Sequence, residues 1–181
     1  MKTAFKKIIY NICEFYFRLK FNKLLKNGQK ICIFDIDNTI ADTWPSFNLK
    51  YKNTSSRLSN LKPFTNMLDL IKSYYHNNYT IVFITARDYR YYFTTKNWLK
   101  KHNIYKSNLI LVQDVEDKIY FLDKIRSECI YYDDLSFNHE NGIVKYYERC
   151  IQKVKNMKNI KYHDYKSIIE IQNGVIKCFT K

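Results

Sequence analysis

The chain has 181 residues, of which 46% are apolar and 17% aromatic, so a disordered chain is excluded and one domain with a hydrophobic core is favoured. Its formal net charge is +14, with eight basic residues and one acidic residue in 1–30 but three basic and eight acidic residues in 107–142. A basic surface attracts nucleic acid, anionic lipid or phosphorylated substrates, but the joint abundance of Lys, Asn, Ile and Tyr is also what A/T-rich coding produces, so the charge alone identifies no partner.

Residues 1–27 are predicted to form a basic amphipathic helix in front of a domain at 28–181. Apolar residues recur in this segment at helical spacing, at Phe5, Ile8, Ile9, Ile12, Tyr16 and Leu19. Two interpretations remain open. The helix packs on the domain or on a second subunit, as in a homodimer, or it lies on an anionic membrane surface.

The same segment and the cysteines predict a cytoplasmic protein. Charges interrupt each apolar run of residues 1–27, which is therefore neither a signal peptide nor a membrane span. The five cysteines lack metal-site spacing and are Cys13, Cys32, Cys129, Cys150 and Cys178. Cys32 and Cys129 lie in apolar runs, which indicates buried free thiols in a reducing compartment.

After Gly28, strand-like and helix-like segments alternate along the chain. The predicted strands are 30–34, 79–84, 109–112, 129–132 and a short 160–162. The predicted helices are 62–76, 89–103, 117–127, 144–157 and 166–171, and 38–61 is expected to be mostly loop. Such alternation predicts an α/β fold with a mostly parallel five-stranded sheet and helices on both faces.

Polar residues follow three of the predicted strands at their carboxyl ends. These are Asp35 and Asp37 after the first strand, Thr85-Ala86-Arg87 after the second, and Asp133-Asp134 after the fourth. Because the carboxyl ends of parallel strands meet at one edge of a sheet, we expect these side chains to converge. Four ionised carboxylates crowd together only around a cation, and oxygen ligands suit Mg²⁺.

A carboxylate beside Mg²⁺ can attack phosphorus and form an aspartyl-phosphate, which divides a difficult hydrolysis into two easier steps. A second carboxyl group two residues further on can protonate the leaving oxygen and then activate water. A hydroxyl group and a cation must hold the phosphoryl oxygens, and Thr85 and a lysine are suited to this.

These residues, taken in order, resemble the motifs of the haloacid dehalogenase (HAD) superfamily of phosphohydrolases over residues 30–140. The motifs are Asp35-x-Asp37-x-Thr39, Thr85 after an apolar strand, a lysine on the helix before the fourth strand, and Asp133-Asp134 after it. The resemblance implies a Rossmann-like three-layer sandwich and a Mg²⁺-dependent phosphomonoesterase. Lys118 fits the placement of the motif lysine better than Lys124, which lies closer to the fourth strand.

The resemblance also implies the roles of the site residues. Asp35 is expected to be nucleophile and metal ligand, and Asp37 general acid and base with its backbone carbonyl on the metal. Thr85 is expected to bind phosphate, and Asp134 with Asp133 to complete the metal site. Substrate contacts are expected from Asn38, Thr39, Ala86 and Arg87. Asn38 stands where the family often has Gly, and Asn tolerates a left-handed backbone.

No large cap domain is expected, because Asp35 and Thr85 are separated by little more than one helix and the loop at 43–61. An open site admits a bulky phosphorylated substrate, such as a nucleic-acid end or a lipid-linked or protein phosphate. It serves a small metabolite or a nucleotide if a partner subunit or the loop at 43–61 covers it. Thr85-Ala86-Arg87 has some similarity to polynucleotide-end phosphatases and nucleotidases. Arg87 and Asp88 either bind substrate or form a surface ion pair that opens the next helix. The alternative function is a non-catalytic HAD-fold protein that docks nucleic acid or membrane through its basic surface.

Overall fold

The computed structural model describes residues 2–25, 29–136, 138–140, 143–145 and 147–175. A parallel five-stranded sheet in the order β5-β4-β1-β6-β9 forms its centre. The strands are β1 (Ile31–Phe34), β4 (Thr80–Thr85), β5 (Asn108–Leu111), β6 (Cys129–Tyr132) and β9 (Ile160–His163). The predicted α/β class and the five parallel strands are confirmed.

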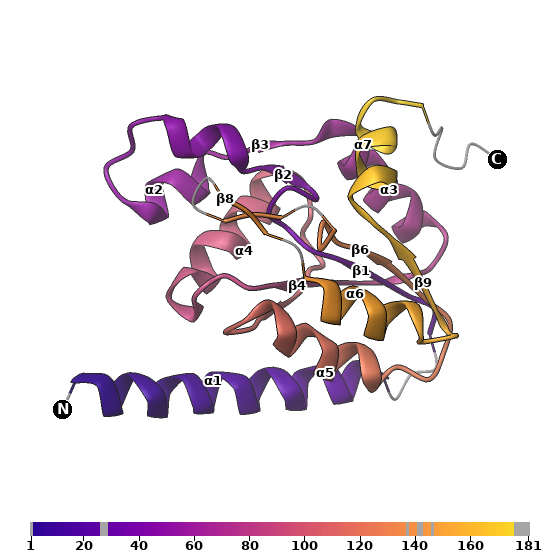
Figure 1. Ribbon diagram of the computed structural model, residues 1–181, viewed down its shortest axis with the longest axis horizontal. Helices are drawn as coiled ribbons and strands as arrows, with labels where there is room; N and C mark the ends of the chain where they lie inside the picture. Colours follow the sequence, from indigo (N-terminus) through magenta and orange to yellow (C-terminus); the bar gives the residue numbers. More distant parts are fainter. Residues whose placement is uncertain (1, 26–28, 137, 141–142, 146, 176–181) are drawn as a thin grey trace.

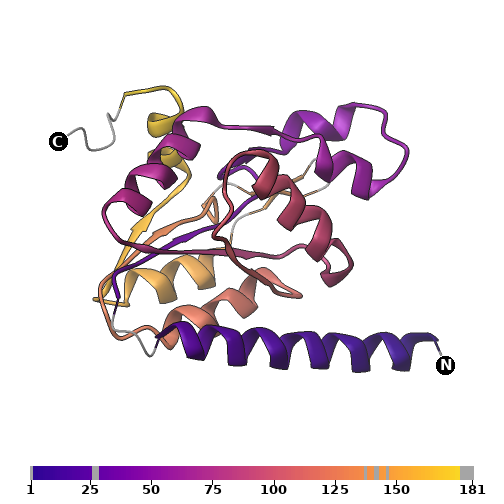
Figure 2. The same ribbon diagram turned by 180° about the vertical axis from the view of Figure 1, so that it is seen from behind.

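Helices cover both faces of this sheet and complete a three-layer sandwich. They are α1 (Lys2–Leu25), α3 (Thr65–His76), α4 (Tyr92–Lys101), α5 (Lys118–Asp123), α6 (Glu148–Lys155) and α7 (Tyr165–Gln172). Figures 1 and 2 show α3 and α7 on one side of the sheet and α1, α5 and α6 on the other. This arrangement follows from right-handed crossovers between parallel strands.

The central strand β1 shows why the strands of the sheet are unbroken apolar runs in the sequence. All four of its residues are buried, because helices cover both faces and the neighbours β4 and β6 cover both edges. Cys32 of β1 and Cys129 of β6 are buried free thiols, as predicted, and Cys13 and Cys150 are free as well. Cys178 lies outside the described residues.

The prediction that residues 38–61 are mostly loop is wrong, because the segment contains more regular structure than expected. They contain β2 (Ala41–Asp42), the 3-10 helix η1 (Trp44–Asn48) and α2 (Thr54–Ser59). The side chain of Asn53 accepts a hydrogen bond from the backbone of Ser56 and caps α2. The helix predicted at 62–76 begins at Thr65, because β3 (Lys62–Pro63) pairs antiparallel with β2.

Two further helix predictions are wrong at their boundaries. The helix predicted at 144–157 begins at Glu148, and it follows a hairpin of β7 (Asn138–Glu140) and β8 (Ile143–Lys145). Strands of three residues are too short for a periodicity of two to be recognised in sequence. The helix predicted at 117–127 consists of the 3-10 helix η3 (Val115–Asp117) followed by α5, and another 3-10 helix, η2 (Tyr89–Tyr91), precedes α4.

The N-terminal helix α1 lies against the domain, but not through the face that its apolar spacing indicated. Its inner face consists of Tyr10, Cys13, Phe17, Phe21 and Leu24, which pack on the core. The rings of Phe17 and Tyr89 are 5.7 Å apart, and those of Phe21 and Phe121 are 5.3 Å apart. The indicated face is exposed, as far as the structure describes its side chains, which excludes Phe5.

The predicted division of the chain between residues 27 and 28 falls outside the described residues and stays a prediction. Of the helices that the structure describes, none is both long enough and apolar enough to cross a bilayer.

Candidate active site

The candidate site begins with a tight turn at the carboxyl end of β1. The backbone N–H of Asp35 continues the sheet by donating to Tyr132 O at 2.9 Å. The chain then turns back, with Asn38 N donating to Ala41 O at 2.8 Å and Ala41 N to Ile36 O at 2.9 Å. Asn38 has φ 55°, so the expected left-handed backbone at this position is confirmed.

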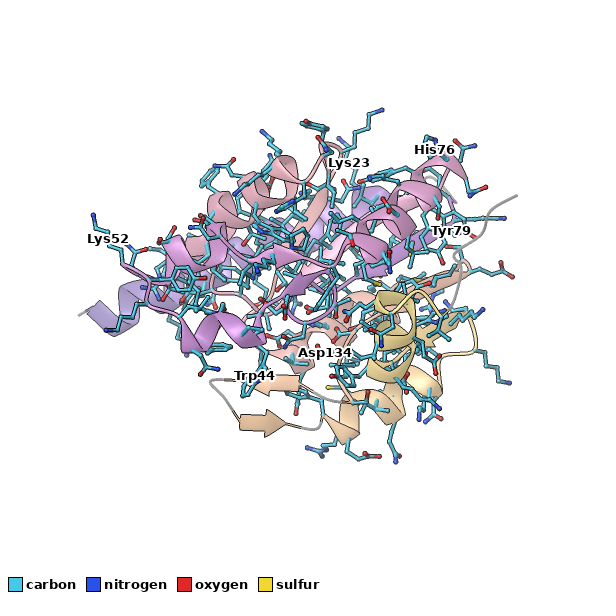
Figure 3. All side chains as sticks on the ribbon, turned by 90° about the horizontal axis from the view of Figure 1, so that it is seen from above. Lys23, Trp44, Lys52, His76, Tyr79 and Asp134 are labelled. Atoms are coloured by element: carbon cyan, nitrogen blue, oxygen red, sulfur yellow. The ribbon has the colours of Figure 1, made fainter. Side chains whose placement is uncertain are left out.

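Three buried carboxyl groups gather below this turn. One oxygen each of Asp35, Asp133 and Asp134 lies within 4.8 Å of the other two. Asp133 Oδ1 and Asp134 Oδ2 are buried and have no hydrogen-bond partner among the described residues. Figure 3 shows Asp134 in the interior of the molecule, whereas Lys52 projects from its surface. This donor set fits Mg²⁺, which takes carboxylate oxygens.

The electrostatics of the three carboxyl groups also favour a cation. Burial raises the pKa of Asp35 to about 7, although the ammonium group of Lys118 opposes the shift. Burial and the charges of Asp133 and Asp35 raise the pKa of Asp134 well above its ordinary value. Because like charges in a buried space disfavour ionisation, a bound cation would stabilise all three carboxylates together.

Lys118, the first residue of α5, lies between two of these carboxylates. Its Nζ donates to Asp35 Oδ1 and to Asp133 Oδ2, each at 2.7 Å, and its side chain is buried. Burial lowers the pKa of Lys118, but the two carboxylates outweigh this and raise it. Lys124 is exposed, with its Nζ 5.4 Å from the centre of the Tyr120 ring. Of the two candidate lysines, the structure therefore places Lys118 in the site.

Asp37 is bound by a guanidinium group from the second strand end. Arg87 Nε donates to Asp37 Oδ2 at 2.7 Å and its Nη2 to Asp37 Oδ1 at 2.8 Å, while Thr43 Oγ1 donates to Oδ1 at 2.6 Å. Burial alone would raise the pKa of Asp37, but the charge and hydrogen bonds of Arg87 reverse the shift and lower it. Asp37 is thus held as a carboxylate.

The alternative that Arg87 and Asp88 form a surface ion pair is wrong, because Arg87 is 6% exposed and binds Asp37 instead. Asp88 does open the next helical segment, since its side chain accepts from Arg90 N and caps η2. It also pairs with the guanidinium group of Arg90 at 3.0 Å.

A cavity of about 270 Å³ opens above these groups. Among the predicted site residues, its wall includes Asp35, Asp37, Thr85, Ala86, Arg87 and Lys118. Thr85 ends β4, and β4 and β1 are neighbours in the sheet. Asn38 and Thr39 are not among the described residues that form this wall, so their expected substrate contacts are not seen here. Both are buried beside Asp35.

Sequence reasoning missed several residues of the site. Arg57 of α2 lines the cavity, lies 4.3 Å above the Phe47 ring and donates to Ser46 Oγ at 3.1 Å. It comes from the segment expected to be loop, where no periodicity marks it. Tyr131 donates a hydrogen bond to Asp133 Oδ2. The signal for Tyr131 was the two-residue period of a strand, which directs it to the same side as Asp133.

The comparisons with known proteins agree with this geometry. The family model described as PITM 1-3, LNS2 domain matches residues 32–162, which is most of the chain and includes all of the site residues discussed above. A search of curated proteins found no match. LNS2 domains are of phosphatase type within the HAD-like superfamily. The chain therefore belongs to the LNS2-domain family of the HAD-like superfamily.

Proposed function

We propose that this protein is a Mg²⁺-dependent phosphomonoester hydrolase that works through an aspartyl-phosphate on Asp35. The observation that carries the proposal is the contact of Asp35 with both the cavity and the buried charges below it. Asp35 lines the cavity, whereas its Oδ1 accepts from Lys118, and Asp133 and Asp134 lie within reach of the same cation. A nucleophile therefore faces substrate beside the ammonium group of Lys118 and beside the carboxylates that would hold the cation.

Asp35, Asp133 and Asp134, with the backbone carbonyl of Asp37, would hold Mg²⁺, which when bound neutralises the carboxylates and the phosphoryl oxygens. The Asp35 carboxylate attacks phosphorus, the bond to the leaving oxygen breaks, and water then hydrolyses the acyl phosphate. Lys118 orients Asp35 through its 2.7 Å contact. The hydroxyl group of Thr85 lies at the cavity wall, where it can donate to a phosphoryl oxygen.

The ion pair with Arg87 suits Asp37 to its role as general base but not to its role as general acid. As a carboxylate with a lowered pKa, Asp37 is ready to accept a proton from the water that attacks the acyl phosphate. Protonation of the leaving oxygen in the first step requires Asp37 to carry a proton. We infer that this step proceeds only when the contacts between Arg87 and Asp37 loosen, as a phosphorylated substrate draws the guanidinium group toward itself.

We further infer that the enzyme has no cap domain. Between β1 and α3, where every residue is described, the chain forms only β2, η1, α2 and β3. Phe47, Arg57 and Tyr91 form the outer wall of the cavity in place of a lid domain. The open wall admits phosphorylated metabolites, nucleotides or nucleic-acid ends, and the guanidinium group of Arg57 is placed to meet an anionic part of any of them.

The decisive experiment compares Asp35→Asn with Asp42→Asn, a substitution of the same kind on β2 outside the cavity wall. With p-nitrophenyl phosphate and Mg²⁺, Asp35→Asn is expected to lower kcat at least about 1,000-fold, because the nucleophile is removed. Asp42→Asn is expected to keep the wild-type rate, and EDTA to abolish it. Undiminished turnover by Asp35→Asn would overturn the assignment.

A substrate screen over nucleotides, sugar phosphates and end-phosphorylated oligonucleotides follows from the same assay. The non-catalytic alternative makes the opposite prediction. It expects no turnover of any substrate by the wild type, together with steeply salt-dependent DNA binding that survives Asp35→Asn.

A further inference from the structure

The side of α1 that faces away from the domain is apolar. Ile8, Ile12, Phe15 and Leu19 are 54–63% exposed, and Ile9 and Tyr16 border them. The spacing of four, three and four residues places the first four on one stripe of the helix, opposite Tyr10, Phe17 and Phe21 on the inner face. We call these six residues the outer face of α1. Figures 1 and 2 show α1 along the outer edge of the molecule, where no other described element covers this side.

We propose that the outer face of α1 docks on an anionic lipid surface. A helix with apolar side chains on opposite sides is expected to bury both sides, but the fold buries only the inner face of α1. The exposed lysines Lys7 and Lys23 lie on the same helix, and residues 1–30 carry a net charge of +7. Apolar side chains bordered by lysines are the chemistry of a helix in the interfacial plane of a membrane, where acyl chains and anionic headgroups meet.

Charge favours lipid over a second copy of the chain. Self-association through α1 would bring two basic helices together in a chain whose net charge is +14. An anionic bilayer requires no matching protein surface and neutralises that charge.

The inner face of α1 connects this docking surface to the catalytic cavity. Tyr10 donates a hydrogen bond to Asp88 Oδ2 at 2.5 Å, and Asp88 belongs to the cavity wall. The rings of Tyr10 and Tyr89 are 5.2 Å apart. A lipid surface bound to the outer face of α1 is therefore separated by this helix from Asp88 of the cavity wall, whichever phosphorylated substrate the site takes.

The test is flotation of the full chain with vesicles of phosphatidylcholine that contain phosphatidylserine at about one third of the lipid. Ile12→Asp places a charge in the centre of the outer face, and Ile8→Asp repeats the change one turn away. The matched control is Val175→Asp, because Val175 is also an exposed aliphatic residue and follows α7, on the opposite side of the sheet. Asp35→Asn is included because flotation needs no turnover.

Wild type, Val175→Asp and Asp35→Asn are expected to float with the anionic vesicles, and Ile12→Asp and Ile8→Asp to be recovered at least about tenfold less. With phosphatidylcholine alone, wild-type recovery is expected to fall several-fold. The proposal is overturned if the wild type remains unbound or if both outer-face variants float like the wild type. It is also overturned if light scattering shows a dimer that Ile12→Asp dissociates, since a second copy then covers this face.

Discussion

Replacing Lys118 with methionine removes a buried positive charge from between two carboxylates while keeping most of the side-chain volume. In the folded protein, Lys118 Nζ is 2.7 Å from oxygens of both Asp35 and Asp133, and all three side chains are buried. The variant must therefore fold with carboxyl groups that have lost their counter-charge. We expect Lys118→Met to be strongly destabilised in the absence of Mg²⁺.

The size of the effect follows from two estimates. At an effective dielectric constant of about 20, each contact of Lys118 contributes an attraction of about 6 kcal/mol before desolvation is subtracted. Breaking a buried ion pair costs about 3–5 kcal/mol in measured cases, so we expect a loss of about 4 kcal/mol.

Urea unfolding in EDTA, followed by the fluorescence of the buried Trp98, measures the loss directly. Lys124→Met is the matched control, since Lys124 is exposed on the same segment and its removal should change stability by less than about 0.5 kcal/mol. If Lys118→Met unfolds at the same urea concentration as Lys124→Met at pH 7, the ion-pair geometry of the site is refuted.

Three other measurements test separate parts of the structure. Mg²⁺ should raise the Tm of the wild type, and Asp134→Asn should remove most of that increase, because a ligand that binds the native state stabilises it by an amount that rises with the logarithm of its affinity. Arg87→Met should raise the pKa of Asp37, since the strongest opposition to the effect of burial is then lost, and a pH–rate profile should show the acid limb of kcat moving to higher pH. Burial and the charge of Lys161 lower the pKa of His163 to about 4, so the unfolded state binds a proton that the native state does not, and stability falls as the pH drops from 7 toward 4. Between pH 7 and pH 5, the free energy of unfolding should fall by about 1 kcal/mol less in His163→Gln than in the wild type, after allowance for partial exposure. Chemical unfolding at the two pH values measures this difference.

The part of the site that lies at strand ends was predictable from the sequence. Asp35, Thr85 and Asp133 each follow an apolar run, and parallel strands bring their carboxyl ends to one edge whatever the loops do. The spacing of the chain also favoured Lys118 over Lys124, and the structure places it in contact with Asp35. These predictions needed only strand order and the direction of the chain.

The contacts between side chains within the site were not predictable in this way. Arg87 had two equally plausible interpretations in sequence, and its contact with Asp37 depends on the turn at residues 36–41, which directs Asp37 toward the end of β4. Arg57 comes from a short helix that begins with polar residues and carries no apolar period. A six-residue helix capped by Asn53 is stabilised by its tertiary contacts, so its sequence alone gives little signal.

The helix α1 shows how a correct pattern can indicate the wrong contact. The apolar spacing of its outer face is regular, whereas its inner face combines Tyr10, Cys13, Phe17 and Phe21, where a polar phenol and a thiol weaken the pattern. The fold buries the inner face because aromatic rings there reach Tyr89 and Phe121. The more regular stripe remains in contact with solvent, which is costly for apolar side chains unless a partner covers them. If α1 docks as proposed, the more regular pattern in the sequence marks its docking surface, and the less regular one marks where the helix is attached to the domain.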